Sequence, residues 1–347
     1  MHTPSSSEAA RRRLPARREA HEPPEARGLA RDAVRMLVAS RGAGLTHARA
    51  HDLPAHLRAG DLLVVNTSAT LPAALPVRRA DGTALRLHLS TPCGDGGRWV
   101  VELRAGGERF ASARAGESLG LPGGARATLL APYLTGARLW LAQLDTAPRP
   151  LLDYLTEHGD PIRYGYVDAS WPLADYQTVF ATQPGSAEMP SAGRPFTPEL
   201  VTALVTHGIA IAPVTLHTGV SSQEAGEPPY PERYAVPEST ARLVNAARAG
   251  GGRVVAVGTT VVRALETVAA QDGSVGADAG WTRHVVTPQT GVRAVDGLLT
   301  GWHDPTATHL LMLEAVGGRA LVEASYRAAR RDGYLWHEFG DMHLLVP

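Results

Sequence analysis

The stretch RVVAVGTT, residues 253–260, indicates the fold class. Residues 253–257 form a mostly apolar run with the length of a buried strand. Gly258 then supplies a turn, and residues 260–270 place apolar side chains on one face, as an amphipathic helix does. A strand that leads through a glycine turn into a helix is typical of an α/β sheet.

The same pattern recurs on both sides of this stretch. Apolar runs predict strands at 34–38, 62–65 and 209–217. Helical periodicity predicts helices at 151–158, 198–206, 238–248, 308–316 and 319–331, the second with Thr197 as its N-cap. We therefore expect an α/β catalytic domain formed by residues 29–75 and 149–347. Residues 1–28, rich in Ser, Arg, Glu and Pro, are expected to form a mobile arm.

Residues 76–148 have a different pattern of apolar and polar residues. Short alternating runs such as LRLHL at 85–89 are separated by glycine-rich turns at 94–97, 106–107 and 122–124. Short strands at this spacing are typical of a small antiparallel β-barrel. The predicted fold is thus an α/β domain interrupted by an inserted small antiparallel β-barrel domain.

Composition excludes several classes of protein. The 347 residues carry 34 basic side chains, all of them arginine, and 34 acidic ones, so the chain lacks the broad positive field of many nucleic-acid binders. A local basic face stays possible. No apolar run approaches the ~20 residues of a membrane span, no secretory signal is visible, and Cys93 is the only cysteine. These features predict a cytoplasmic protein without a membrane segment or an internal disulfide.

Two common nucleotide motifs are missing from the sequence. No predicted strand is followed by a G-x-G-x-x-G turn, and a chain without lysine cannot contain a Walker-type phosphate loop. No cluster with metal-ligand spacing is visible, so no metal is expected.

The run 209–217 ends in a candidate site. A period of two places Thr215 and His217 on one face at the carboxyl end of the strand, where open α/β sheets bind ligands. A histidine there can act as a general base near neutral pH. On spacing alone, a hydrogen-bonded structural histidine is the commoner interpretation.

The turn at Gly258 is a second candidate. Thr259 or Thr260 can cap the following helix, whose free N–H groups attract a carboxylate or phosphate. Arg263 and Glu266 follow at a helical spacing of three, and the simpler alternative is an ordinary cap with a surface ion pair. Further on, His303 and Asp304 are adjacent, but neighbours in an extended segment point apart, which favours a lone loop histidine over a catalytic dyad.

Seven motifs in order along the chain carry a family resemblance. They lie at 60–66, 175–181, 190–197, 214–219, 256–266, 296–308 and 334–341. Together they resemble the S-adenosylmethionine:tRNA ribosyltransferase-isomerase family of the queuosine pathway. The resemblance covers the chain from about residue 31 to the end, and it implies an α/β domain with an inserted β-barrel.

The chain also departs from the family pattern. Where the family has Asn-Asp-Thr-Arg-Val-Ile-Pro-Ala-Arg-Leu, residues 66–75 are NTSATLPAAL, so one Asp and two Arg are missing. The family's Leu-His before Phe-Thr is Arg194-Pro195. Lost cations are natural phosphate or base contacts. The chain is therefore identified as a divergent member.

The resemblance implies a reaction. In the family, the ribosyl part of S-adenosylmethionine moves to an aminomethyl-deazaguanine base in tRNA and rearranges to an epoxycyclopentane, which releases adenine and methionine. We expect S-adenosylmethionine as co-substrate and tRNA as partner. Two alternatives stay open: ribosyl transfer to a small-molecule acceptor, and an inactive S-adenosylmethionine-binding paralogue.

The resemblance also implies roles for individual residues. His217 is the expected base, with Glu232 and Asp341 as further catalytic candidates. Thr259 and Thr260 are expected to hold the methionine carboxylate, and Arg263 and Glu266 to orient polar groups of the donor. The remaining candidates for substrate binding are Asn66, Gly193, Thr215, Gly258 and His303.

Overall fold

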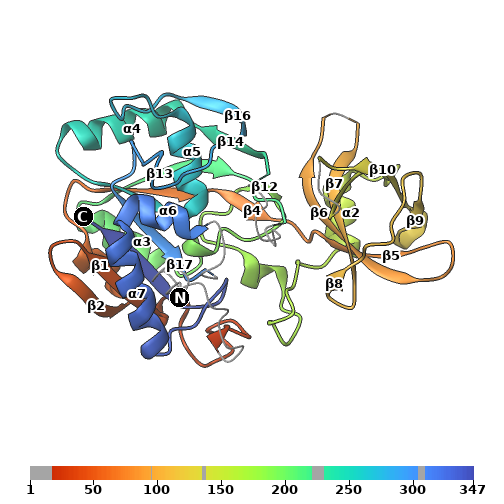
Figure 1. The fold of residues 1–347 in the computed structure, drawn as a ribbon, viewed down its shortest axis with the longest axis horizontal. Helices are drawn as coiled ribbons and strands as arrows, with labels where there is room; N and C mark the ends of the chain where they lie inside the picture. The colour runs from red at the N-terminus through yellow and green to blue at the C-terminus, as the bar shows by residue number, and fades with distance from the viewer. Residues whose placement is uncertain (1–17, 95, 135–137, 221–229, 304–308) are drawn as a thin grey trace, which may run out of the picture.

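The computed structural model describes residues 18–94, 96–134, 138–220, 230–303 and 309–347. Figure 1 shows two units that lie side by side, a larger one with helices around a sheet and a smaller one made of strands. The chain enters the smaller unit after residue 70 and returns to the larger one after residue 160. The predicted fold class, an α/β domain with an inserted antiparallel β-barrel, is confirmed.

A nine-stranded mixed sheet forms the centre of the larger unit. Four of the nine strands, β13, β3, β15 and β17, run parallel to one another, which brings their carboxyl ends to one edge of the sheet. In spatial order the strands are β16 (Asp278–Thr282), β14 (Glu232–Val236), β13 (Ala210–Leu216), β3 (Leu62–Asn66), β15 (Val254–Val257), β17 (Gly297–Gly301), β18 (Met342–Val346), β1 (Arg35–Ser40) and β2 (Gly44–Arg49).

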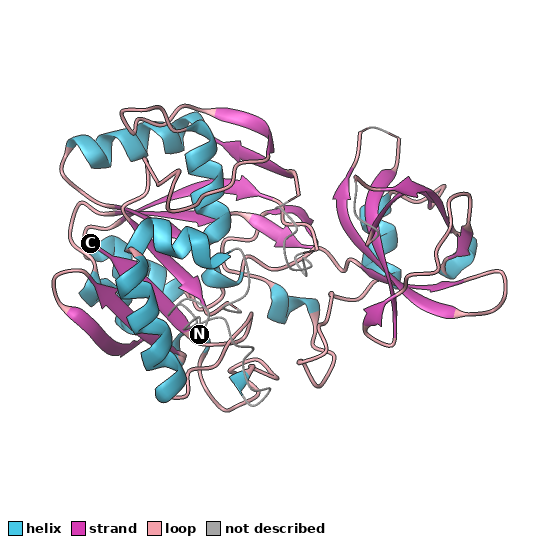
Figure 2. Ribbon diagram, in the orientation of Figure 1, coloured by secondary structure: helices cyan, strands magenta, loops and turns pink. Residues whose placement is uncertain are grey.

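Both faces of this sheet are covered, as the runs of apolar residues predict. On β3, Leu62 and Val64 join the core beneath four helices, while Leu63 and Val65 face the opposite core. The first core lies under α4 (Glu238–Ala249), α5 (Thr259–Val268), α6 (His309–Gly317) and α7 (Arg319–Arg331), and the second under η3 (Ala50–His56) and α3 (Pro198–Thr206). Burial of each such side chain contributes about 1.5–3 kcal/mol. Figure 2 shows these helices, in cyan, around the magenta strands.

The smaller unit is an antiparallel barrel. Its strands are β5 (Ala74–Arg78), β6 (Ala84–Pro92), β7 (Arg98–Ala105), β8 (Glu108–Arg109), β9 (Ser118–Gly120), β10 (Arg126–Pro132) and β11 (Leu139–Asp145). Pairing of β11 with β7 closes the sheet, and closure leaves those strands without a free edge. Leu87, Leu103 and Leu129 are fully buried in its core.

Helix α2 (Leu151–His158) packs on the barrel instead of the nine-stranded sheet. Tyr154 and Leu155 are buried in the barrel core, and the Tyr154 hydroxyl donates to the Pro122 carbonyl over 2.8 Å. The sequence predicts this helix as part of the α/β domain, whose second predicted segment begins at residue 149. The helix follows the barrel because its short apolar face is covered there.

The sequence predicts a mobile arm at residues 1–28. Of these, residues 1–17 lie outside the described part of the chain. Residues 18–28 pack against the C-terminal loop: the Trp336 N–H donates to the Arg18 carbonyl, and the Ala20 N–H donates to the Trp336 carbonyl. Arg27 also donates to the Phe339 carbonyl over 2.8 Å. This docked stretch differs from the free arm that its composition indicated, because its backbone groups find partners 300 residues away in sequence.

Short elements join the two units. Strands β4 (Ser68–Thr70) and β12 (Gln183–Ser186) pair in parallel, and the turns η2 (Arg31–Ala33), η4 (Pro122–Gly124), η5 (Leu173–Tyr176) and η6 (Ser191–Gly193) complete the fold. None of the helices that the structure describes has the length and apolarity to cross a membrane.

Candidate active site

A cavity of about 230 Å³ lies where the carboxyl ends of the parallel strands meet the barrel. Residues 218–220 after β13, residues 258–260 after β15 and Thr300 at the end of β17 line it from the α/β unit. Ser90 and Leu139 line it from the barrel. Ligand binding is thus expected at the edge of the sheet that the sequence analysis indicated.

Helix α5 begins at the cavity. Gly258 has φ of 98°, a conformation that favours glycine, and an added Cβ there would lie 3.4 Å from the Cβ of Ala192. The prediction of a threonine cap is wrong: Gly258 is the N-cap and no side chain caps the helix, because Thr260 Oγ1 accepts a hydrogen bond from Asn66 instead. Gly258, Thr259 and Thr260 all line the cavity, beside the positive end of the helix dipole.

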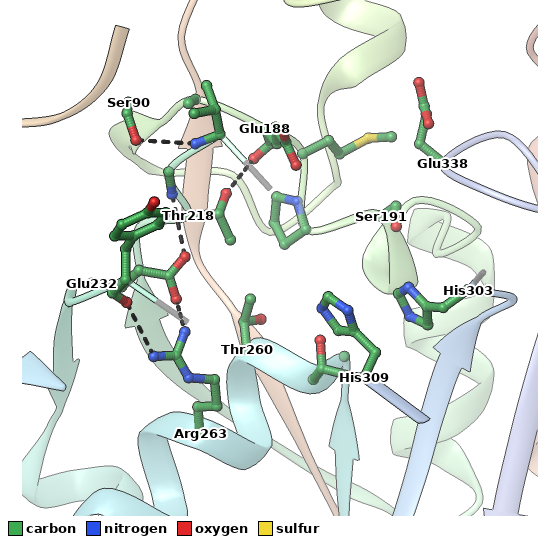
Figure 3. A pocket seen from close by; sticks show the side chains of 18 of the residues that line it. Ser90, Glu188, Ser191, Thr218, Glu232, Thr260, Arg263, His303, His309 and Glu338 are labelled. Atoms are coloured by element: carbon green, nitrogen blue, oxygen red, sulfur yellow. Dashed lines mark hydrogen bonds and ion pairs between the residues drawn. The ribbon is translucent and has the colours of Figure 1, made fainter. Parts of the chain in front are cut away.

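An ion pair between Arg263 and Glu232 lies beside this helix start (Figure 3). Arg263 Nη1 contacts Glu232 Oε2, Nε donates to the His284 carbonyl and Nη2 donates to the Tyr230 carbonyl. Glu232 Oε1 accepts the Gly219 N–H over 3.3 Å. Burial raises the pKa of Glu232, and Arg263 and the Gly219 N–H oppose that rise. Arg263 thus makes three contacts with described residues, and its side chain also lines the cavity.

Two histidines lie on the other side of the helix start. The rings of His303 and His309 stack at 4.6 Å with an angle of 3°, and both line the cavity. Thr300 Oγ1 lies 3.0 Å from His303 Nε2. Burial lowers the pKa of His303 well below its ordinary value, and burial with the charge of Arg263 lowers the pKa of His309 to about 4. Both imidazoles are therefore uncharged near neutral pH. Asp304, the other half of the dyad considered above, lies outside the described residues.

Aromatic rings and a carboxyl group form a further part of the lining. Tyr164 stacks on Tyr166 at 5.8 Å, and Tyr166 stacks on His337 at 4.3 Å. The Tyr166 hydroxyl donates to Glu338 Oε2. These four residues come from the segment after α2 and from the C-terminal loop, and all line the cavity.

His217 and Thr215 are not among the residues that line this cavity. They share a face, as predicted, but it is the face opposite Leu216 and the α5 core. Thr215 Oγ1 lies 2.8 Å from Thr67 Oγ1, and His217 Nδ1 lies 2.7 Å from Ser68 Oγ. Burial lowers the pKa of His217, as does the charge of Arg233.

Four other candidates also lie away from the cavity lining. Asn66 is buried, with Oδ1 accepting from the Leu216 and Ser68 N–H groups and Nδ2 donating to the Leu216 carbonyl and Thr260. It joins the ends of β3 and β13 to α5. Gly193 packs against Thr178, where an added Cβ would lie 3.3 Å from Thr178 Cγ2.

The carboxylates of Glu266 and Asp341 accept hydrogen bonds from backbone N–H groups. Glu266 accepts N–H groups of residues 293–295 at 2.8–3.2 Å, and burial raises its pKa against these hydrogen bonds. It is neither in the cavity lining nor in the surface pair with Arg263 that its spacing allowed. Asp341 accepts the Arg35 and Leu335 N–H groups and pairs with the Arg35 guanidinium at 2.7 Å. It ties the C-terminal loop to β1.

The sequence analysis missed several residues of the cavity. They include His309, Glu338, Tyr166 and Ser191. His309 follows His303 at the start of a predicted helix, which is a signal that could have been used. Glu338 and Tyr166 have no such signal, because each reaches the cavity from a loop. Within the described ranges, no three His, Cys, Asp or Glu side chains gather as a metal site requires.

Comparisons with known proteins agree with the fold. A family model described as "Queuosine biosynthesis protein" matches residues 11–345. The S-adenosylmethionine:tRNA ribosyltransferase-isomerase of Moorella thermoacetica is 38% identical and aligns over 91% of this chain and 94% of its own length. The protein of the same name from Thermus thermophilus is 36% identical, over 91% of this chain and 93% of its own length.

A solved structure is similar over nearly the whole chain. It is the crystal structure of an S-adenosylmethionine tRNA ribosyltransferase from Thermotoga maritima, with a TM-score of 0.53 and 28% identity over 96% of this chain and 98% of that one. Sequence, family model and fold lead to the same conclusion: this chain belongs to the queuosine biosynthesis family that contains the S-adenosylmethionine:tRNA ribosyltransferase-isomerases.

Proposed function

We propose that this protein transfers the ribosyl part of S-adenosylmethionine to an aminomethyl-deazaguanine base in tRNA. The ribosyl group rearranges to an epoxycyclopentane, and adenine and methionine are released. The observation that carries this proposal is one cavity that combines a helix N-terminus, Arg263 and two uncharged histidines. The names of the relatives at 36–38% identity support the same reaction.

The donor carries a carboxylate at its methionine end. The start of α5 supplies N–H groups and a positive dipole end, and the Arg263 guanidinium lines the cavity beside it. The hydroxyl groups of Thr259 and Thr260 lie at the same place. These groups would bind the methionine carboxylate, and Glu232 would keep the guanidinium oriented toward the cavity.

The reaction needs a base for the acidic carbon beside the sulfonium. A base must reach the substrate, so a residue in the cavity lining is favoured over His217. His309 lies beside Thr260 in Figure 3, near the proposed carboxylate site. Its lowered pKa keeps it uncharged and able to accept a proton at neutral pH. His303 stacks on it and fixes the plane of its ring.

The sulfonium group of the donor already activates the ribosyl part for transfer. The protein therefore needs to bind and orient the donor and the acceptor and to move protons between them. A tRNA acceptor also fits the cytoplasmic location that the sequence analysis expects. The loss of two family arginines near residues 69–74 keeps a small-molecule acceptor as an outcome for the experiment to decide.

Incubation with S-adenosylmethionine, with and without tRNA that contains the aminomethyl-deazaguanine base, tests the proposal. Mass spectrometry should detect adenine and methionine only when the tRNA is present, together with a ribosyl-modified nucleoside. Unmodified tRNA serves as the control. Release that occurs with small amines but not with the tRNA would favour the small-acceptor alternative, and no release with any acceptor would favour an inactive paralogue.

A further inference from the structure

Glu338 is a carboxyl group of the cavity that the proposed chemistry has not used. It lies in the loop before β18 and lines the cavity together with Tyr166 and His337. In Figure 3 it lies on the far side of the labelled group from Arg263. The cavity thus has the Arg263–Glu232 ion pair at one end and a carboxyl group with aromatic rings at the other.

The two ends match the two ends of the proposed donor. If the methionine carboxylate binds at Arg263 and the start of α5, the adenine ring extends toward the other end. The near-parallel rings of Tyr164, Tyr166 and His337 there are a suitable neighbour for a flat purine. Glu338 Oε2 accepts the Tyr166 hydroxyl, and the carboxyl group lines the cavity at this end.

We propose that Glu338 is a catalytic residue that donates a proton to the leaving adenine. This inference rests on the proposed function. The bond between C1′ and N9 breaks, its electron pair goes to the adenine ring, and a lone pair of the ring oxygen O4′ forms a second bond to C1′. The carboxyl O–H bond of Glu338 breaks, and its proton goes to a ring nitrogen, so that neutral adenine leaves and Glu338 becomes a carboxylate. The proton that the base removes from the donor, or one from solvent, restores the acid.

Three carboxyl groups line the cavity, those of Glu188, Glu232 and Glu338, and the surroundings of Glu338 favour this role over Glu232. Burial raises the pKa of Glu338, while Tyr166 and His337 oppose the rise and Glu19 adds to it. Tyr176 is a further titratable neighbour, and burial raises its pKa; Arg31 and Arg194 line a second, small cavity together with Glu338. Burial raises the pKa of Glu232 as well, but Glu232 lies in contact with the Arg263 guanidinium, away from the stacked aromatic rings. A buried carboxyl with a raised pKa beside the leaving base is suited to general acid catalysis.

The test is Glu338→Gln in single-turnover reactions with S-adenosylmethionine and the modified tRNA. Adenine release should slow by about a hundredfold or more, while calorimetric donor affinity and Tm stay close to wild type. In the wild type, the rate should fall as pH rises through the pKa of the acid, and this limb should disappear in the variant. Tyr166→Phe removes a hydrogen bond that favours the carboxylate, so it should move the limb to higher pH.

Several results separate failure of this inference from failure of the proposed function. If wild-type protein releases no adenine, the proposed reaction itself is wrong. If the wild type is active and folded Glu338→Gln releases adenine at the same rate, Glu338 is not the acid. If Glu338→Gln has a lowered Tm, the variant Glu338→Asp replaces it as the test. A rate of adenine release in Glu338→Asp that still falls as pH rises supports the proposal. A rate as low as that of Glu338→Gln, without this fall at high pH, overturns it.

Discussion

The contrast between two buried arginines is the sharpest test of the proposed donor site. Arg263 pairs with Glu232 at the cavity, and Arg253 pairs with Asp61 before β3 and β15, at the other end of the strands. Side-chain exposure is 10% and 15% for the first pair and 14% and 2% for the second. Arg263→Ala and Arg253→Ala therefore break similar ion pairs, of which only one can touch the ligand.

Both substitutions should lower the free energy of unfolding by about 3–5 kcal/mol, because each leaves a buried carboxylate unpaired. Only Arg263→Ala should weaken donor binding. Hydrogen bonds to a charged group contribute about 1.5–3 kcal/mol, so Kd for S-adenosylmethionine should rise roughly tenfold to 150-fold. Calorimetry on the two variants, at a temperature where both are folded, measures this difference.

The pH dependence of stability gives a second readout. Without Arg263, the pKa of Glu232 rises further, because the guanidinium no longer opposes the effect of burial. A carboxyl with a raised folded pKa stabilises the fold at low pH and loses that contribution as pH rises through it. The deficit of Arg263→Ala should thus grow from pH 4.5 upward, by about 1.4 kcal/mol for each unit of the shift. Equal donor affinity in the two variants, or a deficit independent of pH, would refute the reasoning.

Further predictions concern the histidines, the acceptor and one helix cap. His309→Gln should lower turnover by about a hundredfold with Tm nearly unchanged, while His217→Gln should lower Tm and leave the rate per folded molecule intact. Measurements of turnover and of thermal melting on the same samples test both expectations. The reverse result would restore His217 as the base. Binding of tRNA should weaken steeply between low and high salt, since phosphate contacts release counterions, and a flat salt titration would contradict a tRNA acceptor. Burial lowers the pKa of His343 to about 3, so this residue alone should contribute a fall in stability of about 2 kcal/mol as pH drops from 6.5 to 5. His303 and His309 add to the total loss, and His343→Phe should make that total smaller by the His343 share in denaturation experiments. Thr197→Ala should cost about 1 kcal/mol, because the Thr197 side chain accepts the Leu200 N–H at the start of α3; an unchanged denaturation midpoint would exclude this capping role.

Local patterns were sufficient for the elements of the fold. The helices at 151–158, 198–206 and 319–331 have the predicted bounds, and Thr197 caps α3 as expected. The alternation of residues 62–65 between two cores follows from the period of a strand. The glycine turns of residues 76–148 indicated the barrel for the same reason: backbone geometry and side-chain periodicity depend on neighbours in sequence.

The composition of the cavity depended on packing between distant segments. The period of two placed His217 beside Thr215, but these side chains contact Thr67 and Ser68, whereas residues 218–220 beyond the strand line the cavity. The spacing of Arg263 and Glu266 indicated a pair, yet Arg263 contacts Glu232 across 31 residues and Glu266 holds residues 293–295.

The family and the fold class could be predicted from the amino-acid sequence, and the cavity lies at the carboxyl ends of the parallel strands, where the sequence predicts a site. The set of side chains that share the cavity required the folded chain: Tyr166 comes from the segment after α2, His309 from the start of α6, and Glu338 from the C-terminal loop. Secondary structure follows from short-range periodicity, whereas the direction of a loop side chain is set by long-range contacts. Asp341 shows this directly, because it fixes the loop of Glu338 by hydrogen bonds to Arg35, more than 300 residues earlier in the chain.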